Sequence, residues 1–226
     1  MRDEHIVVEP SILYFGTPVV LISTKNEDGS ANIAPMSSAF WLGWRCALGL
    51  DSSSKTTRNL IRTGECVLNL PSVKEVAAVN RLARLTGANP VPAPKAARGY
   101  SHESTKFETA GLTQVPSETV SAPRALECQV QMEAVVAARH GLGEDSPWKG
   151  ALLLFEARIQ RVHVAPEFLM DGWPNRIDPD NWRPLIMSFQ KFYGLASGQV
   201  HDSFLGEISE ELYRSPDVDR ARLAAV

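Results

Sequence analysis

The sequence has few cysteines and no long apolar segment, and each absence excludes a class of protein. Cys46, Cys66 and Cys128 lie far apart and form no C-x-x-C pair, so a disulfide framework or a zinc site is a poor interpretation. No stretch is long and apolar enough to span a bilayer, and acidic residues fall within the first five positions, where a secretory signal would be basic. We therefore expect a cytoplasmic protein with reduced thiols and no membrane partner.

Positive charge is not in excess either. The formal net charge is -3 and the pI is near 6.0, so no basic field covers the protein to hold nucleic acid. Any phosphate group must therefore be held by local features. No metal is expected, because the five histidines lack the spacing of metal ligands: His5, His102, His140, His163 and His201.

Two nucleotide-binding motifs are also missing. There is no Walker loop and no complete G-x-G-x-x-G, so a Rossmann site for a nicotinamide cofactor is not supported. What is present is the composition of an ordinary globular protein, with 44% hydrophobic and 22% charged residues in a chain of 226. We predict one domain over residues 1–226, with an excursion at residues 86–124 and a C-terminal helical tail from about residue 204.

The first 70 residues alternate short apolar runs with turn residues. The runs predict strands or extended segments at residues 18–24, 31–40, 45–50 and 65–70. Pro35 cannot donate a hydrogen bond to a strand ladder, so it suits an edge strand or a bulge. A helix is predicted over residues 55–63, capped by the small side chains of the loop at residues 51–54 and ended by Gly64.

The clearest strand signal lies in the second half of the chain. Between residues 126 and 136, apolar residues alternate with glutamate and glutamine, so we expect one face in the core and the other in water. A turn is predicted at residues 140–143 and a returning strand at residues 151–164. Together these segments predict an antiparallel hairpin.

The other segments are helical or irregular. Helical spacing predicts a second helix over residues 73–85, whereas residues 86–100 are rich in Pro, Ala and Gly and predict a surface loop, either a lid or a dimer arm. A loop is expected at residues 171–184, then a short apolar run and a helical pattern to residue 212, and a surface helix or tail at 213–226. Strands joined mostly by hairpins favour a mainly β (α+β) fold, an antiparallel barrel with flanking helices.

The loop at residues 51–54, with the helix start after it, is the best local anion site. It offers hydroxyl groups, the Lys55 ammonium and the free N–H groups of a helix N-terminus, which suit a phosphate monoester. The alternative is that the serines only cap the helix, while Lys55 and Arg58 are solvated surface charges.

A second candidate segment lies at residues 32–38. It combines the strand-breaking Pro35, the flexible Met36 and the small hydroxyls of Ser37 and Ser38, and a flat heterocycle with polar edges can pack on such a backbone. The alternative is an edge strand with a bulge, followed by ordinary core aromatics.

Taken in order, several short motifs resemble the flavin reductase-like, FMN-binding split-barrel family. They are Pro-Val-Val-Leu-Ile-Ser-Thr at residues 18–24, Asp-Gly-Ser-Ala-Asn-Ile-Ala-Pro-Met-Ser-Ser at 28–38, Lys-Thr-Thr-Arg-Asn-Leu at 55–60 and Gly-Glu-Cys-Val-Leu-Asn-Leu at 64–70. The resemblance covers residues 17–71 well and the hairpin at 126–164 loosely, and it extends to residues 183–186 and 189–194.

The resemblance implies an antiparallel Greek-key split β-barrel with flanking helices, and a homodimer with a cofactor pocket near the subunit interface. By motif position, the residues that would lie against the isoalloxazine ring and ribityl chain are Asn32, Pro35, Met36, Ser37 and Ser38. The residues that would hold the phosphate are Ser52, Ser53, Ser54, Lys55 and Thr56, and the cofactor-binding set also includes Asn59.

We therefore expect an FMN-dependent oxidoreductase in which NADH or NADPH is the electron donor. The acceptor would be a small molecule or a partner oxygenase, and no residue is assigned as catalytic because the flavin itself does the chemistry. One alternative is an FMN-binding electron-transfer or sensor module without its own NAD(P)H turnover. Another is a barrel for haem or a deazaflavin, although haem would need an axial ligand and no histidine falls within the matched motifs.

Overall fold

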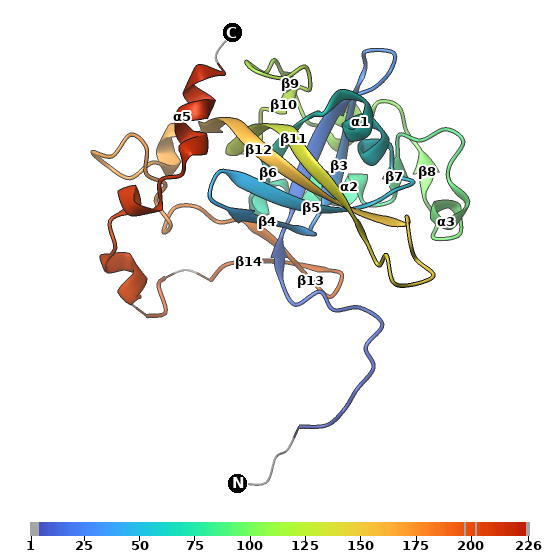
Figure 1. Cartoon of the computed structure of the whole chain (residues 1–226), viewed down its shortest axis with the longest axis horizontal. Helices are drawn as coiled ribbons and strands as arrows, with labels where there is room; N and C mark the ends of the chain where they lie inside the picture. Colours follow the sequence, from blue (N-terminus) through green and yellow to red (C-terminus); the bar gives the residue numbers. More distant parts are fainter. Residues whose placement is uncertain (1–4, 197, 202, 225–226) are drawn as a thin grey trace.

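One antiparallel sheet of seven strands forms the body of the protein (Figure 1). The computed structural model describes residues 5–196, 198–201 and 203–224, so residues 1–4 and the last two residues of the predicted tail lie outside the described residues. The strand order is β3-β2-β6-β11-β12-β5-β4. The strands are β2 (Val20–Lys25), β3 (Ala31–Met36), β4 (Ala39–Leu42), β5 (Arg45–Asp51), β6 (Glu65–Leu70), β11 (Val130–Leu142) and β12 (Leu152–Val164).

Strand β3 lies at one edge of this sheet, and Pro35 is in it. A proline at an edge removes no hydrogen bond that a further strand would need. The prediction of an edge strand for Pro35 is therefore confirmed.

Helix α1 (Lys55–Thr63) confirms the predicted helix at both ends. The Ser54 hydroxyl accepts a hydrogen bond from the Thr57 N–H at 3.0 Å, which caps the N-terminus. Gly64 ends the helix with φ of 70° and donates its N–H to the Leu60 carbonyl. Glycine suits this position because a Cβ is strained in the left-handed region.

Two hydrophobic cores meet at β2, which is why this strand is buried on both faces. Val20 and Ile22 pack into a core between the strands of the main sheet. Leu21, and Val19 just before the strand, instead pack toward helices α2 (Val76–Leu82) and α4 (Lys106–Ala110). Apolar side chains therefore alternate between two dry environments along β2, a pattern typical of a fully buried strand.

The predicted excursion at residues 86–124 is wrong in one respect, since part of it is core. Phe107 and Ala110 of α4 are buried in the second core. The expected loop at residues 86–100 is closed by a parallel pair of short strands at its two ends. The short elements of this region are β7 (Leu85–Thr86), α3 (Ala93–Ala96), β8 (Ser101–His102), β9 (Gln114–Val115) and β10 (Arg124–Ala125).

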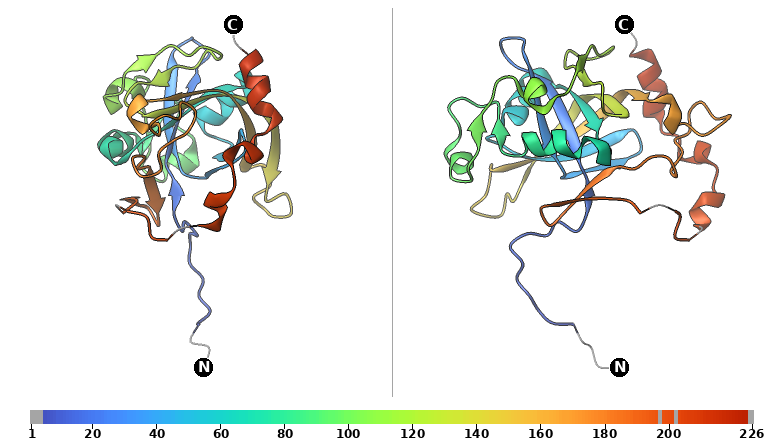
Figure 2. Two further views of the ribbon diagram at one scale, coloured as in Figure 1. Left: turned by 90° about the vertical axis from the view of Figure 1, so that its left-hand side faces the viewer. Right: turned by 180° about the vertical axis from the view of Figure 1, so that it is seen from behind.

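The helix predicted over residues 73–85 is shorter than expected. A 3-10 turn, η1 (Val73–Glu75), opens it, and α2 then ends at Leu82. Ser72 and Glu75 form a capping box at its start, which is a local signal for a helix N-terminus. Figures 1 and 2 show α3, β7 and β8 at one end of the main sheet and α5 (Pro216–Leu223) at the opposite end.

The hairpin of β11 and β12 confirms the antiparallel pair, but the expected wet face is wrong at two positions. Gln131 and Glu133 are buried, because residues 117–125 fold back over that face. Glu133 accepts hydrogen bonds from the Glu118 N–H at 2.9 Å, the Thr119 N–H at 2.6 Å and the His163 Nε2 at 2.8 Å. The predicted turn at residues 140–143 is also displaced, since β11 continues to Leu142.

The C-terminal part contains two more strands before its helices. β1 (Thr17–Pro18), β13 (Leu185–Ser188) and β14 (Lys191–Gly194) form a small antiparallel sheet. Where the structure describes the predicted helical pattern that follows, it contains the short 3-10 turns η3 (Phe204–Glu207) and η4 (Glu210–Tyr213). α5 is the surface helix expected in the tail.

All three cysteines are buried free thiols. Burial raises the pKa of Cys46 to about 12 and also raises the pKa of Cys66 and Cys128. Since the thiolate is the reactive form, these residues should be inert in the folded protein.

The buried Glu133 carboxylate gives a testable dependence of stability on pH. Burial alone would raise its pKa, but hydrogen bonds from His163, Thr119 and Glu118 lower the pKa to about 2. The ionised carboxylate therefore stabilises the fold fully above the unfolded pKa of about 4.5 and loses this effect as the pH falls toward 2. We predict that Glu133→Gln lowers the free energy of unfolding by about 3 kcal/mol at pH 7 and by less than half of that at pH 3.

Urea unfolding of both proteins at the two pH values measures this difference. Glu144→Gln is the matched control, because Glu144 is a half-exposed carboxylate on the hairpin loop. An equal loss for Glu133→Gln at pH 7 and pH 3 would contradict the assignment.

Candidate functional site

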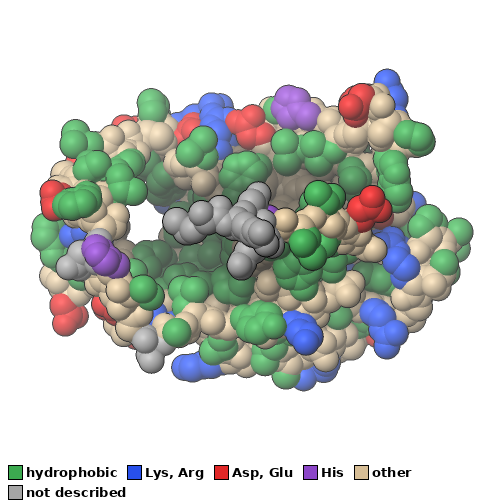
Figure 3. Space-filling view, turned by 90° about the horizontal axis from the view of Figure 1, so that it is seen from below, with side chains coloured by type: hydrophobic (Ala, Val, Ile, Leu, Met, Phe, Trp, Pro, Cys, Tyr) green, Lys and Arg blue, Asp and Glu red, His purple; other side chains and the backbone are tan. Residues whose placement is uncertain are grey.

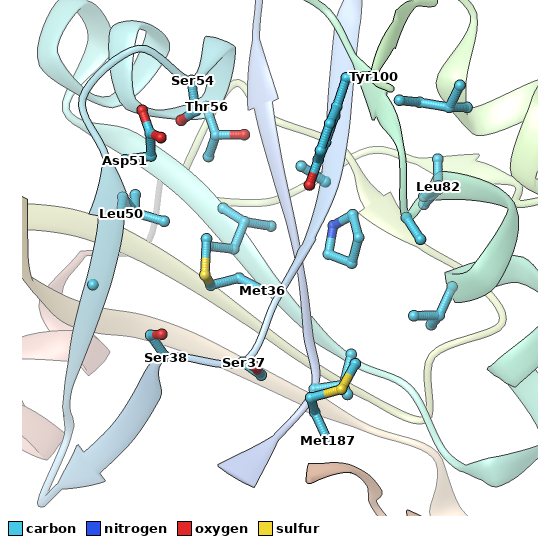
Figure 4. A pocket seen from close by; sticks show the side chains of 18 of the residues that line it. Met36, Ser37, Ser38, Leu50, Asp51, Ser54, Thr56, Leu82, Tyr100 and Met187 are labelled. Atoms are coloured by element: carbon cyan, nitrogen blue, oxygen red, sulfur yellow. The ribbon is translucent and has the colours of Figure 1, made fainter. Parts of the chain in front are cut away.

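A cavity of about 620 Å³ opens between the ends of β3 and β5, helix α2 and the segment after β7. This volume falls within the range of pockets that bind cofactors and other small molecules. Figure 4 shows it from close by. It is lined by Tyr14, Val19, Ile22, Ala34, Pro35, Met36, Ser37, Ser38, Gly49, Leu50, Asp51, Ser54, Thr56, Val79, Leu82, Ala83, Leu85, Lys95, Arg98, Tyr100, Leu142, Leu152, Met187 and Phe192.

The cavity is polar at one end and apolar along the rest of its wall. Asp51, Ser54 and Thr56 come together where β5 leads into α1, as Figure 4 shows. The remaining wall is supplied mainly by Met36, α2, β13 and β14. Such an arrangement suits a ligand with a flat apolar body and a charged end.

The polar end has the features of an anion site. α1 has no acidic residue in its first turn, and its first N–H groups have no partner within the helix. Thr56 is buried, and its hydroxyl accepts a hydrogen bond from Asn32 at 3.2 Å. The helix N-terminus and the hydroxyl groups therefore favour negative charge at this end of the cavity.

Two cations of the segment after β7 face the same end. Arg98 lies 3.6 Å from the Asp51 carboxylate, and Lys95 and Arg98 lie 5.5 Å and 5.9 Å from the centre of the Tyr100 ring. Figure 4 shows the Tyr100 side chain extending into the cavity. Because two positive side chains are offset by a single carboxylate, the local charge favours an added anion.

The pKa values of Lys95 and Asp51 at this end reflect the same arrangement. Burial lowers the pKa of Lys95, while Asp51 opposes this shift. Burial would raise the pKa of Asp51, but hydrogen bonds from Ser53 and the charges of Lys95 and Arg98 hold it below its usual range. A bound dianion would add to the effect of Asp51 and favour the charged form of Lys95.

Six of the residues predicted from the sequence line the cavity, in two groups. Ser37 and Ser38 lie between β3 and β4, outside both strands, and the Ser38 carbonyl accepts a hydrogen bond from the Gly49 N–H at 2.8 Å. The cavity therefore meets backbone here that is only partly used by the strand ladder. The six residues are Pro35, Met36, Ser37, Ser38, Ser54 and Thr56.

The structure does not place the other predicted residues on the cavity wall. Ser52 and Ser53 lie in the loop before α1, where the N–H and hydroxyl of Ser53 both bond to Asp51. Lys55 forms an ion pair with Glu27 on the β2–β3 turn. The sequence pattern therefore located the loop before α1 correctly, but it did not predict that the Lys55 side chain turns toward Glu27.

Asn32 lies directly behind the cavity wall. Its amide group donates to Thr24 at 3.3 Å and to Thr56 at 3.2 Å, while its carbonyl oxygen is buried without a hydrogen-bond partner among the described residues. Gly87 covers that oxygen closely, since a Cβ on Gly87 would lie 2.7 Å from it. The segment after β7 therefore packs against β3 and α1, next to the polar end of the cavity.

Asn59 is fully buried and joins α1 to the β2–β3 hairpin. Its amide group donates to the Thr24 hydroxyl at 3.0 Å and to the Asn26 carbonyl oxygen at 2.9 Å. It does not line the cavity, so its observed contacts are structural.

Sequence reasoning missed Lys95, Arg98 and Tyr100 as part of the site. They lie in the Pro-rich segment, which matches no motif of the resemblance. The available signal was the spacing of two basic residues three positions apart beside a tyrosine, a pattern too common to assign a ligand by itself.

The described residues contain no cluster of three or more His, Cys, Asp or Glu side chains suited to a metal ion. Over the same residues, no helix combines the length and the apolar character that a membrane crossing requires. His163, which the sequence left without a role, is bonded to Glu133 away from the cavity.

One family model matches most of the chain. Residues 12–196 match the family model described as "Flavin reductase like domain". The chain is 37% identical over 201 residues to the uncharacterized protein YdfE of Bacillus subtilis (strain 168), covering 88% of this chain and 93% of that protein.

Solved structures support the same fold. The flavoredoxin of Desulfovibrio vulgaris (Miyazaki F) superposes with a TM-score of 0.70 at 22% identity, covering 90% of this chain and 99% of that one. A protein described as a putative flavin reductase with a split barrel domain, from Shewanella frigidimarina NCIMB 400, gives a TM-score of 0.65 at 16% identity, with 83% and 86% covered. At these identities the likeness shows the fold alone, a split barrel.

The contacts of Asn59 predict a structural role rather than a direct role in binding. Asn59→Ala removes one buried and one partly buried hydrogen bond and leaves the Asn26 carbonyl oxygen without its partner, so we expect the free energy of unfolding to fall by about 1–3 kcal/mol. Urea unfolding measures the loss, and Asn181→Ala, at an exposed loop position, is the control. Unchanged stability of Asn59→Ala would contradict the structural role.

Proposed function

Because this chain belongs to the flavin reductase-like family, we propose that its cavity binds FMN and that the protein is an FMN-dependent oxidoreductase. The family and the fold support a flavin-related reductase. The observation that carries the choice of FMN is the polarity of the cavity, with its apolar wall and its anion-suited end.

The phosphate would lie at the start of α1. There it would meet the N–H groups of the first helical turn, the Thr56 hydroxyl, and the cations Lys95 and Arg98. A phosphate monoester carries close to two negative charges at neutral pH, and two cations with a helix N-terminus balance such a group. Riboflavin has no phosphate and would gain nothing from these contacts.

The flavin ring would lie along the apolar wall. Met36, Leu82 and Met187 surround that part of the cavity in Figure 4. The backbone of residues 35–38 runs past the same space, and its groups outside the ladder would bond to the polar edges of the ring. The Asn32 amide group lies behind Thr56 and donates a hydrogen bond to its hydroxyl, so it orients that hydroxyl at the polar end of the cavity.

When bound, FMN supplies the hydride and electron chemistry, with NADH or NADPH as donor and a small molecule or a partner oxygenase as acceptor. The protein supplies binding, orientation and shielding from water. Asp51 is the only carboxylate among the described residues that line the cavity, and it lies at the anion end. Among the described residues, the apolar wall therefore has no carboxylate, lysine or histidine, which agrees with chemistry that belongs to the cofactor.

A second function has one observation in its favour. Lys95 and Arg98 are the only cations among the described residues that line the cavity, and both are assigned to the flavin phosphate. The cavity thus has no further basic group for the phosphates of NADH or NADPH. This favours, as the alternative, an FMN-binding electron-transfer or sensor module that does not itself oxidise a nicotinamide.

The two functions differ in one measurement. We predict that the purified protein takes up FMN, and that the visible absorbance of the bound flavin is bleached when NADH or NADPH is added without oxygen. A protein that binds FMN but is bleached only by dithionite would support the electron-transfer module. A protein that takes up no FMN would refute both functions.

The assignment of the phosphate site predicts selective loss of FMN. Lys95→Ala with Arg98→Ala should weaken FMN binding roughly 10- to 100-fold, because charge-assisted hydrogen bonds to phosphate are lost, and should change riboflavin binding less than about threefold. Lys55→Ala should have a smaller effect on FMN, since Lys55 is paired with Glu27. Fluorescence titration with both flavins and with FAD measures these constants.

Lys74→Ala is the matched control, because Lys74 is an exposed lysine outside the cavity. Equal weakening of FMN and riboflavin by the double substitution would show that the phosphate is held elsewhere.

A further inference from the structure

The anion end of the cavity contains a carboxylate that the proposed function leaves without a role. Asp51 is the only carboxylate among the described residues that line the cavity, and Figure 4 shows its side chain beside Ser54 and Thr56. A carboxylate and a phosphate repel each other, because both carry negative charge. Asp51 therefore opposes the ligand that the other groups of this end attract.

The backbone and the side chain of Asp51 are both held in place. At the end of β5 it pairs with Leu152 of β12, and its carbonyl accepts hydrogen bonds from the Ser54 N–H at 3.1 Å and the Thr57 hydroxyl at 2.8 Å. Its Oδ1 accepts from the Ser53 N–H at 2.8 Å and from the Ser53 hydroxyl at 2.6 Å. The carboxylate therefore cannot turn away from the cavity without breaking both hydrogen bonds from Ser53.

The second carboxylate oxygen of Asp51 faces a cation. It lies 3.6 Å from the Arg98 guanidinium. Burial would raise the pKa of Asp51, but hydrogen bonds from Ser53 and the charges of Lys95 and Arg98 hold it below its usual range, so the carboxylate is ionised at neutral pH. Because the side chains of Arg98 and Asp51 are 58% and 37% exposed, the ion pair contributes little to the stability of the fold. Its main effect is on the charge that the cavity presents to a ligand.

The segment that carries Arg98 is anchored without this ion pair. The ends of the segment are joined by the pairing of β7 with β8. Within it, the Arg98 Nε donates a hydrogen bond to the Pro94 carbonyl at 3.0 Å, and the guanidinium lies 5.9 Å from the centre of the Tyr100 ring. Loss of the Asp51 charge should therefore leave Arg98 at the cavity and make its guanidinium available to a ligand.

No excess of positive charge over the whole protein outweighs the effect of Asp51. The formal net charge is -3. On the face shown in Figure 3, hydrophobic side chains predominate, and acidic and basic side chains lie scattered around the rim. The attraction of an anion to the cavity therefore comes from a few local groups, and a single negative charge among them has a large effect.

We propose that Asp51 is a specificity-determining residue: it pairs with Arg98 in the free protein, competes with a bound phosphate for the same guanidinium, and so limits the negative charge that the cavity accepts. This proposal rests on the proposed function, since it concerns the same anion end. Together with Lys95 and Arg98, the ionised Asp51 leaves one net positive charge there. With the N-terminus of α1, that charge suits a phosphate monoester better than a more highly charged diphosphate.

Asp51→Asn tests the proposal, because asparagine keeps an oxygen that can accept both hydrogen bonds from Ser53 but removes the charge. We expect the variant to bind FMN roughly 10-fold more tightly and to change riboflavin binding less than about twofold, since only FMN carries the phosphate. Fluorescence titration with the two flavins measures both dissociation constants.

Asp28→Asn is the matched control, because Asp28 makes the same local contacts away from the cavity. Its Oδ1 accepts from the Ser30 N–H at 2.9 Å and from the Ser30 hydroxyl at 2.6 Å, and it lies on the β2–β3 turn. The control changes the net charge of the protein by the same amount. It should leave both dissociation constants within about twofold of the wild-type values.

A second measurement uses no flavin. In calorimetric titrations, inorganic pyrophosphate should bind Asp51→Asn roughly 10-fold more tightly than it binds the wild-type protein, and inorganic phosphate should gain less because it carries less charge. When Arg98→Ala is present in both proteins, the gain for pyrophosphate should fall below about threefold, because the two anions then have no guanidinium to compete for.

The proposal is overturned if FMN or pyrophosphate, where it binds the wild-type protein, binds Asp51→Asn no more tightly. It is also overturned if Asp28→Asn gives the same gain, if Arg98→Ala leaves the gain unchanged, or if pyrophosphate binds neither protein. Tighter binding of pyrophosphate to Asp51→Asn, with no binding of FMN to either protein, would support the role of Asp51 and refute the assignment of FMN.

Discussion

The candidate site depends on the hydrogen bonds that fix the start of α1 to the edge of the sheet. The Thr24 hydroxyl accepts from both Asn32 on β3 and Asn59 on α1, and Asn32 also donates to Thr56. These groups are buried, and in such surroundings each of the hydrogen bonds between them is strengthened and restricts the arrangement of β3 and α1. The helix N-terminus is thereby held at the end of β5, and every feature of the anion end is built around it.

The parts of the fold that could be predicted from the sequence are those set by neighbouring residues. The ends of α1 follow from Ser54 and Gly64, whose capping chemistry is local, and the edge position of β3 follows from the missing N–H of Pro35. Alternation also located the β11–β12 pair. The alternation placed the Glu133 side chain in water, whereas a loop covers it in the structure. The path of that loop cannot be read from the alternation of apolar and polar residues along the strand.

In the site, too, the sequence predicted the features that neighbouring residues determine and missed those that depend on distant contacts. The sequence identified the loop before α1 and the backbone of residues 35–38, because the relevant groups are adjacent in the chain. It assigned the positive charge to Lys55, whereas the structure turns Lys55 toward Glu27 and brings Lys95 and Arg98 from a segment about 40 residues further on. The packing of Gly87 against Asn32, the pairing of β7 with β8 and the ion pair of Arg98 with Asp51 place that segment at the site, and such contacts have no sequence signature.

The anion end and the apolar wall of the cavity are formed by different parts of the chain. The anion end belongs to the rigid junction of β5 and α1. The apolar wall includes Tyr14, which precedes β1, and Met187 and Phe192 of the small sheet of β1, β13 and β14. The wall is therefore completed by the two ends of the matched region of the chain, whereas the anion end is formed by segments between residues 51 and 100. A substitution in the small sheet should for that reason alter the apolar wall and leave the β5–α1 junction unchanged.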